Sequence, residues 1–203
     1  MMERPSHLDW QPMQELEEKI NVCRDCRLCE SRTKAVPGSG SYGAKIVFIG
    51  EGPGKEEDLQ GKPFVGAAGK FLNTMLKEIG WKREDVFITN VVKCRPPNNR
   101  DPLSDEVANC FKYLDTQLKF IKPALIVTLG RHSMERFLPG YKISEIHGQP
   151  KRVQGIFTEQ QVIFPLYHPA AALYNPALRA TLIADMKKLP LLIDEIVEGK
   201  YTC

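Results

Sequence analysis

The sequence predicts an α/β domain in which a parallel sheet is covered by helices on both faces. Four short apolar runs, rich in Val, Ile and Phe, have the composition of fully buried strands: 45–50, 85–93, 124–130 and 161–168. Helix-like stretches separate three of these runs, at 68–80 and 104–121. Apolar strands that alternate with helices are typical of βαβ units. With 203 residues, the chain is long enough for one domain with a full core, spanning 1–203.

Further segments complete the expected organisation. Residues 10–30 carry apolar residues among charges and then cysteines, which predicts a helix and a cysteine segment packed on the domain. Residues 35–43 are rich in Gly, Ser and Pro and predict a loop. Residues 131–138 predict a short helix, and 177–197 a terminal helix that Pro190 interrupts.

Charge and cysteine content narrow the class of protein. The chain carries 28 basic and 25 acidic residues, a net charge of +3, so a surface that binds nucleic acid must be local. No apolar run reaches the length of a membrane span, and the polar first residues are not a signal peptide. We therefore expect a cytosolic protein, where disulfides are rare. The six cysteines then indicate metal or redox chemistry.

Polar side chains stand at the end of each predicted strand. In chain order they are Glu51, Asn90, His132 and His168. Ligands of open α/β sheets bind beyond the carboxyl ends of the strands, where the connecting loops converge. We therefore expect these four residues, far apart in the sequence, to lie around one crevice.

The segment after the first strand, GEGPGKEEDLQGKPFVGAAG (50–69), is rich in glycine but does not match a phosphate-binding loop. Lys55 stands where the dinucleotide fingerprint G-x-G-x-x-G needs its third glycine, and no Walker sequence is present. Either the glycines only form a tight turn, or the backbone comes close to a flat, uncharged ligand beside a carboxylate. A phosphate would be repelled by four acidic residues: Glu51, Glu56, Glu57 and Asp58.

The cysteines have a spacing that suits a metal centre. Cys23, Cys26 and Cys29 form a run that resembles the start of a ferredoxin motif, without its following C-P. Cys94 and Cys110 lie at a predicted strand end and in a predicted helix. A [4Fe–4S] cluster, a zinc ion and a set of reduced buried cysteines are the three interpretations. The spacing favours the cluster over zinc, because zinc ribbons usually carry two close C-x-x-C pairs.

Three further side chains allow both a structural and a functional interpretation, and a fourth is a functional candidate. His168 precedes a proline, and is either an ordinary hydrogen-bonded histidine or a neutral imidazole that stabilises a developing oxyanion. Asn90 either caps its strand or presents an acceptor and a donor to a base edge. Phe64 is either core or a stacking platform for a flipped base. Leu173 is a candidate wedge in a base stack.

The motifs GEGPGKEEDLQGKPFVGAAG, TNVVKCRPP and HPAA, in this order and with cysteines at 23, 26, 94 and 110, resemble type 4 uracil-DNA glycosylases. These enzymes are the iron–sulfur branch of their superfamily, and the resemblance extends from Cys23 to the terminal helix. It implies a three-layer sandwich whose central four-stranded parallel sheet is flanked by helices. It also implies a monofunctional DNA-repair hydrolase that flips deoxyuridine out of DNA and breaks its N-glycosidic bond, releasing uracil and leaving an abasic site.

The resemblance implies a role for three of the side chains. Phe64 would stack on uracil, and Asn90 would pair with its N3–H and O4. Cytosine reverses the donor and the acceptor at these positions, so the pocket would reject it. His168 would bind the negative charge that develops on O2, which makes it a catalytic residue.

The backbone of Gly50, Glu51 and Gly52 would line the same pocket. Better-known members of the superfamily place a water-orienting Asp where this chain has Gly52. We therefore hypothesise that Glu51, which directly follows the strand, positions the water or opposes the cationic sugar. Glu57 is the less favoured choice for this role.

The resemblance also implies one [4Fe–4S] cluster with a structural role. Its ligands would be Cys23, Cys26, Cys94 and Cys110. Cys29 is additional to this pattern, and Cys203 is expected to be a bystander. The last two ligands bracket a loop whose Arg95 and Arg100 are candidate contacts to DNA phosphates, with Leu173 as a third DNA contact.

The implied partner is uracil-containing DNA, single- or double-stranded, with no membrane. A replication sliding clamp is a further candidate partner. We expect a monomer in the cytoplasm of a prokaryotic cell, with the chromosome.

Two other classes of function are alternatives. A non-catalytic, metal-containing nucleic-acid-binding module would bind DNA in a salt-dependent manner without turnover, and would have no special need of Glu51, Asn90 or His168. An enzyme that uses a nucleotide or redox cofactor on the same sheet is the second. The unmatched nucleotide fingerprints count against it.

Overall fold

The computed structural model describes residues 10–154 and 160–201, so Cys203 lies outside the described residues. Within them, the strands form one six-stranded sheet in the order β1-β3-β2-β4-β6-β5. The inner strands β3, β2, β4 and β6 are parallel, which confirms the prediction from the apolar runs. The strands are β1 (Ser39–Gly40), β2 (Ile46–Gly50), β3 (Phe87–Asn90), β4 (Leu125–Leu129), β5 (Lys151–Gln154) and β6 (Gln160–Leu166).

The two edge strands add to the predicted four. β1 pairs antiparallel with β3, and β5 pairs antiparallel with β6. β1 has two residues and lies inside the segment 35–43, which predicts a loop. β5 has the sequence KRVQ, and none of its residues is fully buried. Its charged residues are poor strand formers, so composition gives no strand signal there, although charge is usual on an edge.

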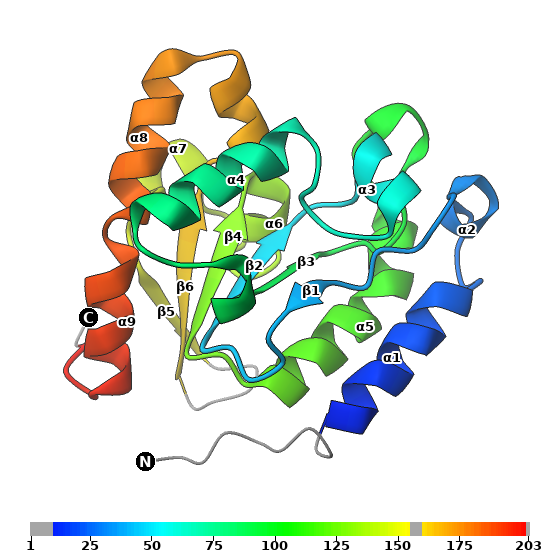
Figure 1. The fold of residues 1–203 in the computed structure, drawn as a ribbon, viewed down its shortest axis with the longest axis horizontal. Helices are drawn as coiled ribbons and strands as arrows, with labels where there is room; N and C mark the ends of the chain where they lie inside the picture. Colours follow the sequence, from blue (N-terminus) through cyan, green and yellow to red (C-terminus); the bar gives the residue numbers. More distant parts are fainter. Residues whose placement is uncertain (1–9, 155–159, 202–203) are drawn as a thin grey trace.

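Helices cover both faces of the sheet (Figure 1), in the predicted three layers. The strand side chains alternate between the faces: Ile46 and Phe48 pack on one side, Val47 and Ile49 on the other. The first side is covered by α4 (Ala67–Glu78), α8 (Pro176–Met186) and α9 (Leu189–Val197). The second is covered by α1 (Gln11–Val22), α5 (Ser104–Ile121), α6 (Arg131–Glu135) and α7 (Ile143–Ile146). The remaining short elements are the α-helices α2 (Leu28–Ser31) and α3 (Lys55–Gln60) and the 3₁₀ helices η2 (Arg83–Asp85), η3 (Pro97–Asn99) and η4 (Pro169–Leu173).

The terminal segments match the prediction in part. The helix expected over 10–30 ends at Val22, because Cys23 adopts a non-helical backbone (φ −56°, ψ 138°). The predicted interruption at Pro190 is confirmed: α8 ends at Met186, and the proline lies in the first turn of α9, where its missing N–H costs nothing. In the described part of the chain, no helix combines the length and the apolar character needed to cross a membrane.

A buried ion pair ties the loop after β3 to the start of α5. Glu106 is fully buried and accepts two hydrogen bonds from the guanidinium of Arg100, at 2.8 and 2.7 Å. It also accepts one from the backbone N–H of Leu103, at 2.8 Å. The bonds from Arg100 hold the pKa of Glu106 below its ordinary value. The loop between Arg95 and Leu103 is therefore fixed in place beside the ends of the strands.

We expect Glu106→Gln to lower the free energy of unfolding by about 1.5 kcal/mol at pH 7, because it removes the charge-assisted hydrogen bonds between the buried carboxylate and Arg100. Denaturant unfolding measures this loss, and Asp115→Asn, which breaks the exposed pair with Lys119, is the matched control with a loss under about 0.5 kcal/mol. The pKa of Glu106 is lowered by folding, so the difference should shrink as the pH falls below 4.5. Equal losses in the two variants would show that this pair does not hold the loop.

Candidate active site

The ends of the parallel strands meet around a cavity of about 350 Å³. β2 and β3 are in register so that Gly50 pairs with Asn90, which places the last residues of both strands side by side. In the sheet, β3 lies next to one edge of β2 and β4 lies next to its other edge. The chain therefore builds the sheet outward from β2 first in one direction and then in the other. The cavity therefore lies at the point where the strand order reverses, the usual ligand position in open α/β sheets.

Most of the predicted site residues line this cavity. Arg95 and Leu173 do not, and Leu173 is exposed to solvent. Gly50 is not among the lining residues either, and a β-carbon at this position would overlap the Asn90 amide oxygen and the Phe64 ring. Only glycine permits this close approach. The predicted residues that line the cavity are Glu51, Gly52, Glu57, Phe64, Asn90, Arg100 and His168.

The side-chain oxygen of Asn90 is buried and has no hydrogen-bond partner among the described residues. A buried polar atom without a partner costs about 1–3 kcal/mol, so an orphan of this kind indicates a ligand position. The backbone of Asn90 is held by Lys93, a fully buried lysine whose Nζ donates to Asn90 O at 2.8 Å. Nζ also donates to Thr89 Oγ1 and Gln117 Oε1, both at 2.6 Å. Burial lowers the pKa of Lys93 to about 7.

His168 is a neutral imidazole with a defined tautomer. It follows β6 and is extended (φ −66°, ψ 133°), as expected for the residue before Pro169. The backbone N–H of Ala170 donates to its Nδ1 at 3.1 Å. Burial lowers the pKa of His168 to about 4. Because Nδ1 is an acceptor and the ring is neutral at pH 7, the ring proton is on Nε2. The ring centre lies 5.7 Å from that of Phe64.

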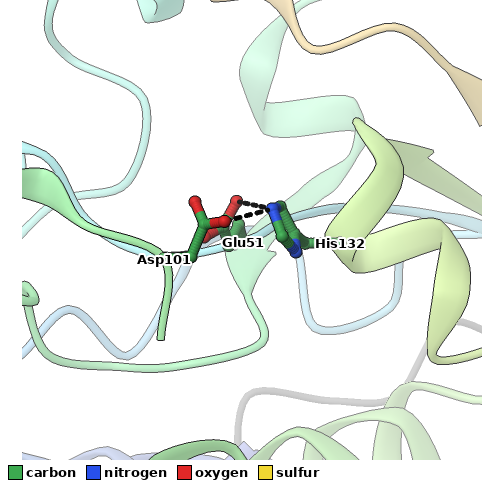
Figure 2. Close-up of side chains that lie close together, drawn as sticks. All are labelled: Glu51, Asp101 and His132. Carbon is green, nitrogen blue, oxygen red and sulfur yellow. Dashed lines mark ion pairs between the residues drawn. The ribbon is translucent and has the colours of Figure 1, made fainter. Parts of the chain in front are cut away.

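Glu51 lies beside a histidine and a second carboxylate (Figure 2). Glu51 and Asp101 line the cavity, whereas His132 is not among its lining residues. Nε2 of His132 lies 3.1 Å from Asp101 Oδ2 and 3.7 Å from Glu51 Oε2. Burial raises the pKa of Glu51; His132 opposes this effect, Asp101 adds to it, and Arg131 opposes it. The structure thus brings Glu51 and His132 together, as the strand-end argument predicts. Asp101 joins them from the loop that Arg100 holds in place.

Two of the acids in the glycine-rich segment fix backbone. One carboxylate oxygen of Glu57 accepts hydrogen bonds from the N–H groups of Val65 and Gly66, at 2.8 and 2.9 Å. The buried Asp58 accepts one from Thr33 N at 2.9 Å. The Glu57 oxygen that makes these bonds is therefore already engaged, which favours Glu51 as the carboxylate that acts on a ligand.

Five cysteines line a second cavity: Cys23, Cys26, Cys29, Cys94 and Cys110. Burial raises the pKa of Cys94 and Cys110, the latter to about 11, so these thiols stay protonated at neutral pH unless a metal binds. Two N–H groups point at the sulfurs: Arg32 Nη1 lies 3.0 Å from Cys94 Sγ, and Lys93 N lies 3.2 Å from Cys110 Sγ. Hydrogen-bond donors close to sulfur stabilise bound thiolates and affect the reduction potential of the metal that they hold. The donor set therefore fits a thiolate-bound metal centre.

Lys93 and Asp101 are site residues that sequence reasoning misses. Lys93 closes an apolar run, where a lysine normally marks the exposed end of a strand. Its partner Gln117 comes from α5, so the buried network exists only after the helix has packed. Asp101 meets His132 across a loop of irregular structure, which leaves no periodic signal.

Comparison with known proteins agrees with this geometry. Residues 37–188 match the model of the Uracil DNA glycosylase superfamily. A type-4 uracil-DNA glycosylase of Sulfurisphaera tokodaii is 51% identical over 94% of this chain and 88% of the relative. Those of Archaeoglobus fulgidus and Thermotoga maritima are 48% and 42% identical, each over 87% of this chain and over 91% and 92% of the relatives. The chain belongs to the uracil-DNA glycosylase superfamily, in its type-4 branch.

The superfamily match includes every residue that lines the cavity of about 350 Å³, together with Cys94 and Cys110. Cys23 and Cys26 precede the matched segment. The cavity and the cysteine centre are joined through adjacent residues, because the side chain of Lys93 holds the Asn90 backbone and its backbone N–H donates to Cys110 Sγ.

We expect His168 to remain neutral, with its proton on Nε2, from pH 8 down to pH 5, because burial lowers its pKa to about 4. Two-dimensional ¹⁵N–¹H spectra of the histidine rings measure both the tautomer and the titration. His168→Gln identifies the resonance. A midpoint near 6.5, or a proton on Nδ1, would contradict this description of the site.

Proposed function

We propose that the protein removes uracil from DNA by hydrolysing the N-glycosidic bond of deoxyuridine, which leaves an abasic site. The observation that carries the proposal is the amide oxygen of Asn90, which has no hydrogen-bond partner in the described part of the chain and lies in a cavity also lined by Phe64 and His168. A cavity of about 350 Å³ accommodates a single base, and a base inside a duplex must be flipped out of the stack to enter it.

Asn90 selects the base by its hydrogen-bonding edge. Its Oδ1 accepts the N3–H of uracil, and its Nδ2 donates to O4. Cytosine has an acceptor at N3 and a donor at C4, so both contacts become repulsive. Such a site rejects the wrong base by roughly 10⁴-fold, because its buried polar groups would be left unpaired. Phe64 stacks on the flat base, which explains an aromatic side chain beside the amide.

His168 acts on the leaving base. Its neutral imidazole donates from Nε2 to O2 of uracil, where negative charge collects as the bond to the sugar breaks. A neutral donor stabilises this charge without forming an ion pair in the ground state, so it acts chiefly on the transition state. The backbone of residues 50–52 closes the pocket around the same base.

Glu51 acts on the water and the sugar. The oxygen of water forms a bond to C1′ while the C1′–N1 bond breaks, and the electron pair of that bond leaves with uracil. The carboxylate of Glu51 orients the water, opposes the positive charge on the sugar and takes up the proton that the water loses. The uracil anion gains its proton at N1 from solvent. His132 counters the rise in the pKa of Glu51 and thereby favours its ionised form.

Segments beside the pocket are proposed to contact the DNA around the flipped base. Arg95 and the exposed Leu173 are proposed to contact phosphate and the base stack, respectively. Arg100 is also a proposed phosphate contact, but its guanidinium is bound to Glu106, so phosphate has to compete with this ion pair. The main effect of Arg100 is to hold the loop that carries Asp101.

Cys23, Cys26, Cys94 and Cys110 are proposed to hold one [4Fe–4S] cluster. Such a cluster supplies four strong covalent attachments between α1, the end of β3 and α5, and it takes no part in hydrolysis. The N–H groups of Arg32 and Lys93 stabilise the thiolate charge. The loop between Cys94 and Cys110 contributes Pro96, Asn99 and Asp101 to the pocket, so its attachment at both ends supports the site.

The uracil-excision assay uses the iron-loaded protein and a uracil-containing oligonucleotide, followed by alkali, which cleaves at abasic sites. We expect cleavage at uracil and none in the thymine control. Asn90→Ala should lower the single-turnover rate by about 10²–10⁴-fold, because it removes the base-reading contacts. Glu51→Gln should lower it by about 10²–10³-fold, because the water loses its base.

The matched control is Asn21→Ala, which alters an exposed asparagine of α1 that does not line the pocket and should change the rate less than threefold. Nearly full activity of Glu51→Gln would refute the role of this carboxylate. DNA binding by the iron-loaded protein without any cleavage would refute the enzyme and favour the non-catalytic binding module.

The cysteine centre is tested by metal content. We expect the protein purified without oxygen to be brown and to contain about four iron atoms per chain. Cys110→Ser should lose the iron and unfold at a lower temperature. Cys29→Ser, a half-buried cysteine of the same cavity, should keep both the iron and the melting temperature. Equal iron loss in both variants would contradict the proposed ligand set, and stoichiometric zinc would contradict the cluster.

Other expectations stay predictions. Binding to a replication sliding clamp and the monomeric state are checked by sedimentation of the protein with and without such a clamp. The cytoplasmic location is checked by cell fractionation.

A further inference from the structure

Phe64, the proposed stacking platform, has a strained backbone. Its φ is +51°, in the left-handed region that non-glycine residues rarely occupy. The side chain is nevertheless buried and lines the pocket. Such a conformation persists only where the surroundings enforce it, so other groups must hold this turn of the chain.

Arg83 supplies that restraint from a distant part of the sequence. It lies in η2, just before β3, and its Nη2 donates to the carbonyl oxygen of Pro63 at 2.7 Å. Its Nη1 donates to the carbonyl oxygen of Phe64 at 3.0 Å. One planar guanidinium thus binds two consecutive carbonyl groups, on both sides of the strained φ. A lysine, with a single nitrogen, cannot reproduce this fork.

The next two residues are held by the opposite charge. The carboxylate of Glu57 binds the N–H groups of Val65 and Gly66. The turn therefore presents its carbonyl groups to a cation and its N–H groups to an anion. The Phe64 carbonyl also lies so close to Gly69 that a β-carbon there would overlap it.

We propose that Arg83 is a positioning residue for base binding: by clamping the carbonyl groups of Pro63 and Phe64, it keeps the Phe64 ring in the orientation that stacks on the flipped base. This inference rests on the proposed function. Arg83 does not line the pocket and touches the base only through Phe64.

The clamp has a kinetic signature. A stacked ring contacts the flipped base equally in the ground state and in the transition state, so its loss weakens binding and leaves the chemical step almost unchanged. Releasing the ring should cost about tenfold in affinity, equivalent to about 1.4 kcal/mol, within the usual range for stacking of one base on an aromatic side chain. A variant that is merely less stable would instead lower the active fraction.

The experiment measures single-turnover excision over a range of protein concentrations, with the iron-loaded protein and a uracil-containing oligonucleotide. In Arg83→Ala and Arg83→Lys we expect the half-saturating concentration to rise about tenfold, with the maximal rate constant changed less than threefold. The inhibition constant for free uracil should rise by the same factor. Millimolar guanidinium should restore the affinity of Arg83→Ala and leave Arg83→Lys unaffected.

The matched control is Asn73→Ala. It removes the side-chain partner that Nη1 of Arg83 binds at 2.9 Å but leaves both carbonyl contacts intact, so its half-saturating concentration should stay within twofold of the parent. If Arg83→Lys and Arg83→Ala show the parent's half-saturating concentration, or only a smaller amplitude, Arg83 is not a positioning residue. An equal loss in Asn73→Ala would also overturn the clamp. An inactive parent protein would refute the proposed function instead.

Discussion

The pocket depends on the register between two parallel strands. β2 and β3 pair so that Gly50 lies beside Asn90, and the missing side chain at Gly50 leaves room for the Asn90 amide and the Phe64 ring. Because β4 and β6 run in the same direction, their ends bring His132 and His168 to the same edge of the sheet. A shift in this register would separate Asn90, the proposed base-reading group, from Glu51, the carboxylate proposed to act on the water.

The groups that face the ligand lower the stability of the folded protein. The hydrogen-bonded residues behind them, Lys93 and Arg83, offset this loss. The Asn90 oxygen has no partner among the described residues, the His168 imidazole is neutral and half-buried, and Phe64 is strained. Behind them the polar groups are satisfied: Lys93 makes three hydrogen bonds at or below 2.8 Å, and Arg83 binds two carbonyl groups. Preorganised sites combine unpaired groups toward the ligand with a rigid supporting layer in this way.

Much of this arrangement follows from local sequence. The inner strands are predicted because buried parallel strands are continuously apolar, and the site residues at their ends follow from that assignment. The short edge strands β1 and β5 leave no such pattern. The end of the first helix at Val22 is set by the backbone turn into the cysteine segment. The roles of Arg83 and Lys93 depend on partners that approach only in the folded chain, so neither residue can be distinguished from an ordinary surface cation in the sequence.

The central claim is that the buried oxygen of Asn90 is the acceptor for the N3–H of uracil. A crystal structure of the iron-loaded protein with free uracil tests it most directly. The account predicts uracil stacked on Phe64, with its N3 within about 3 Å of Asn90 Oδ1 and its O2 facing His168 Nε2. Uracil bound elsewhere, or an Asn90 oxygen that stays unpartnered while the base occupies the cavity, would contradict it.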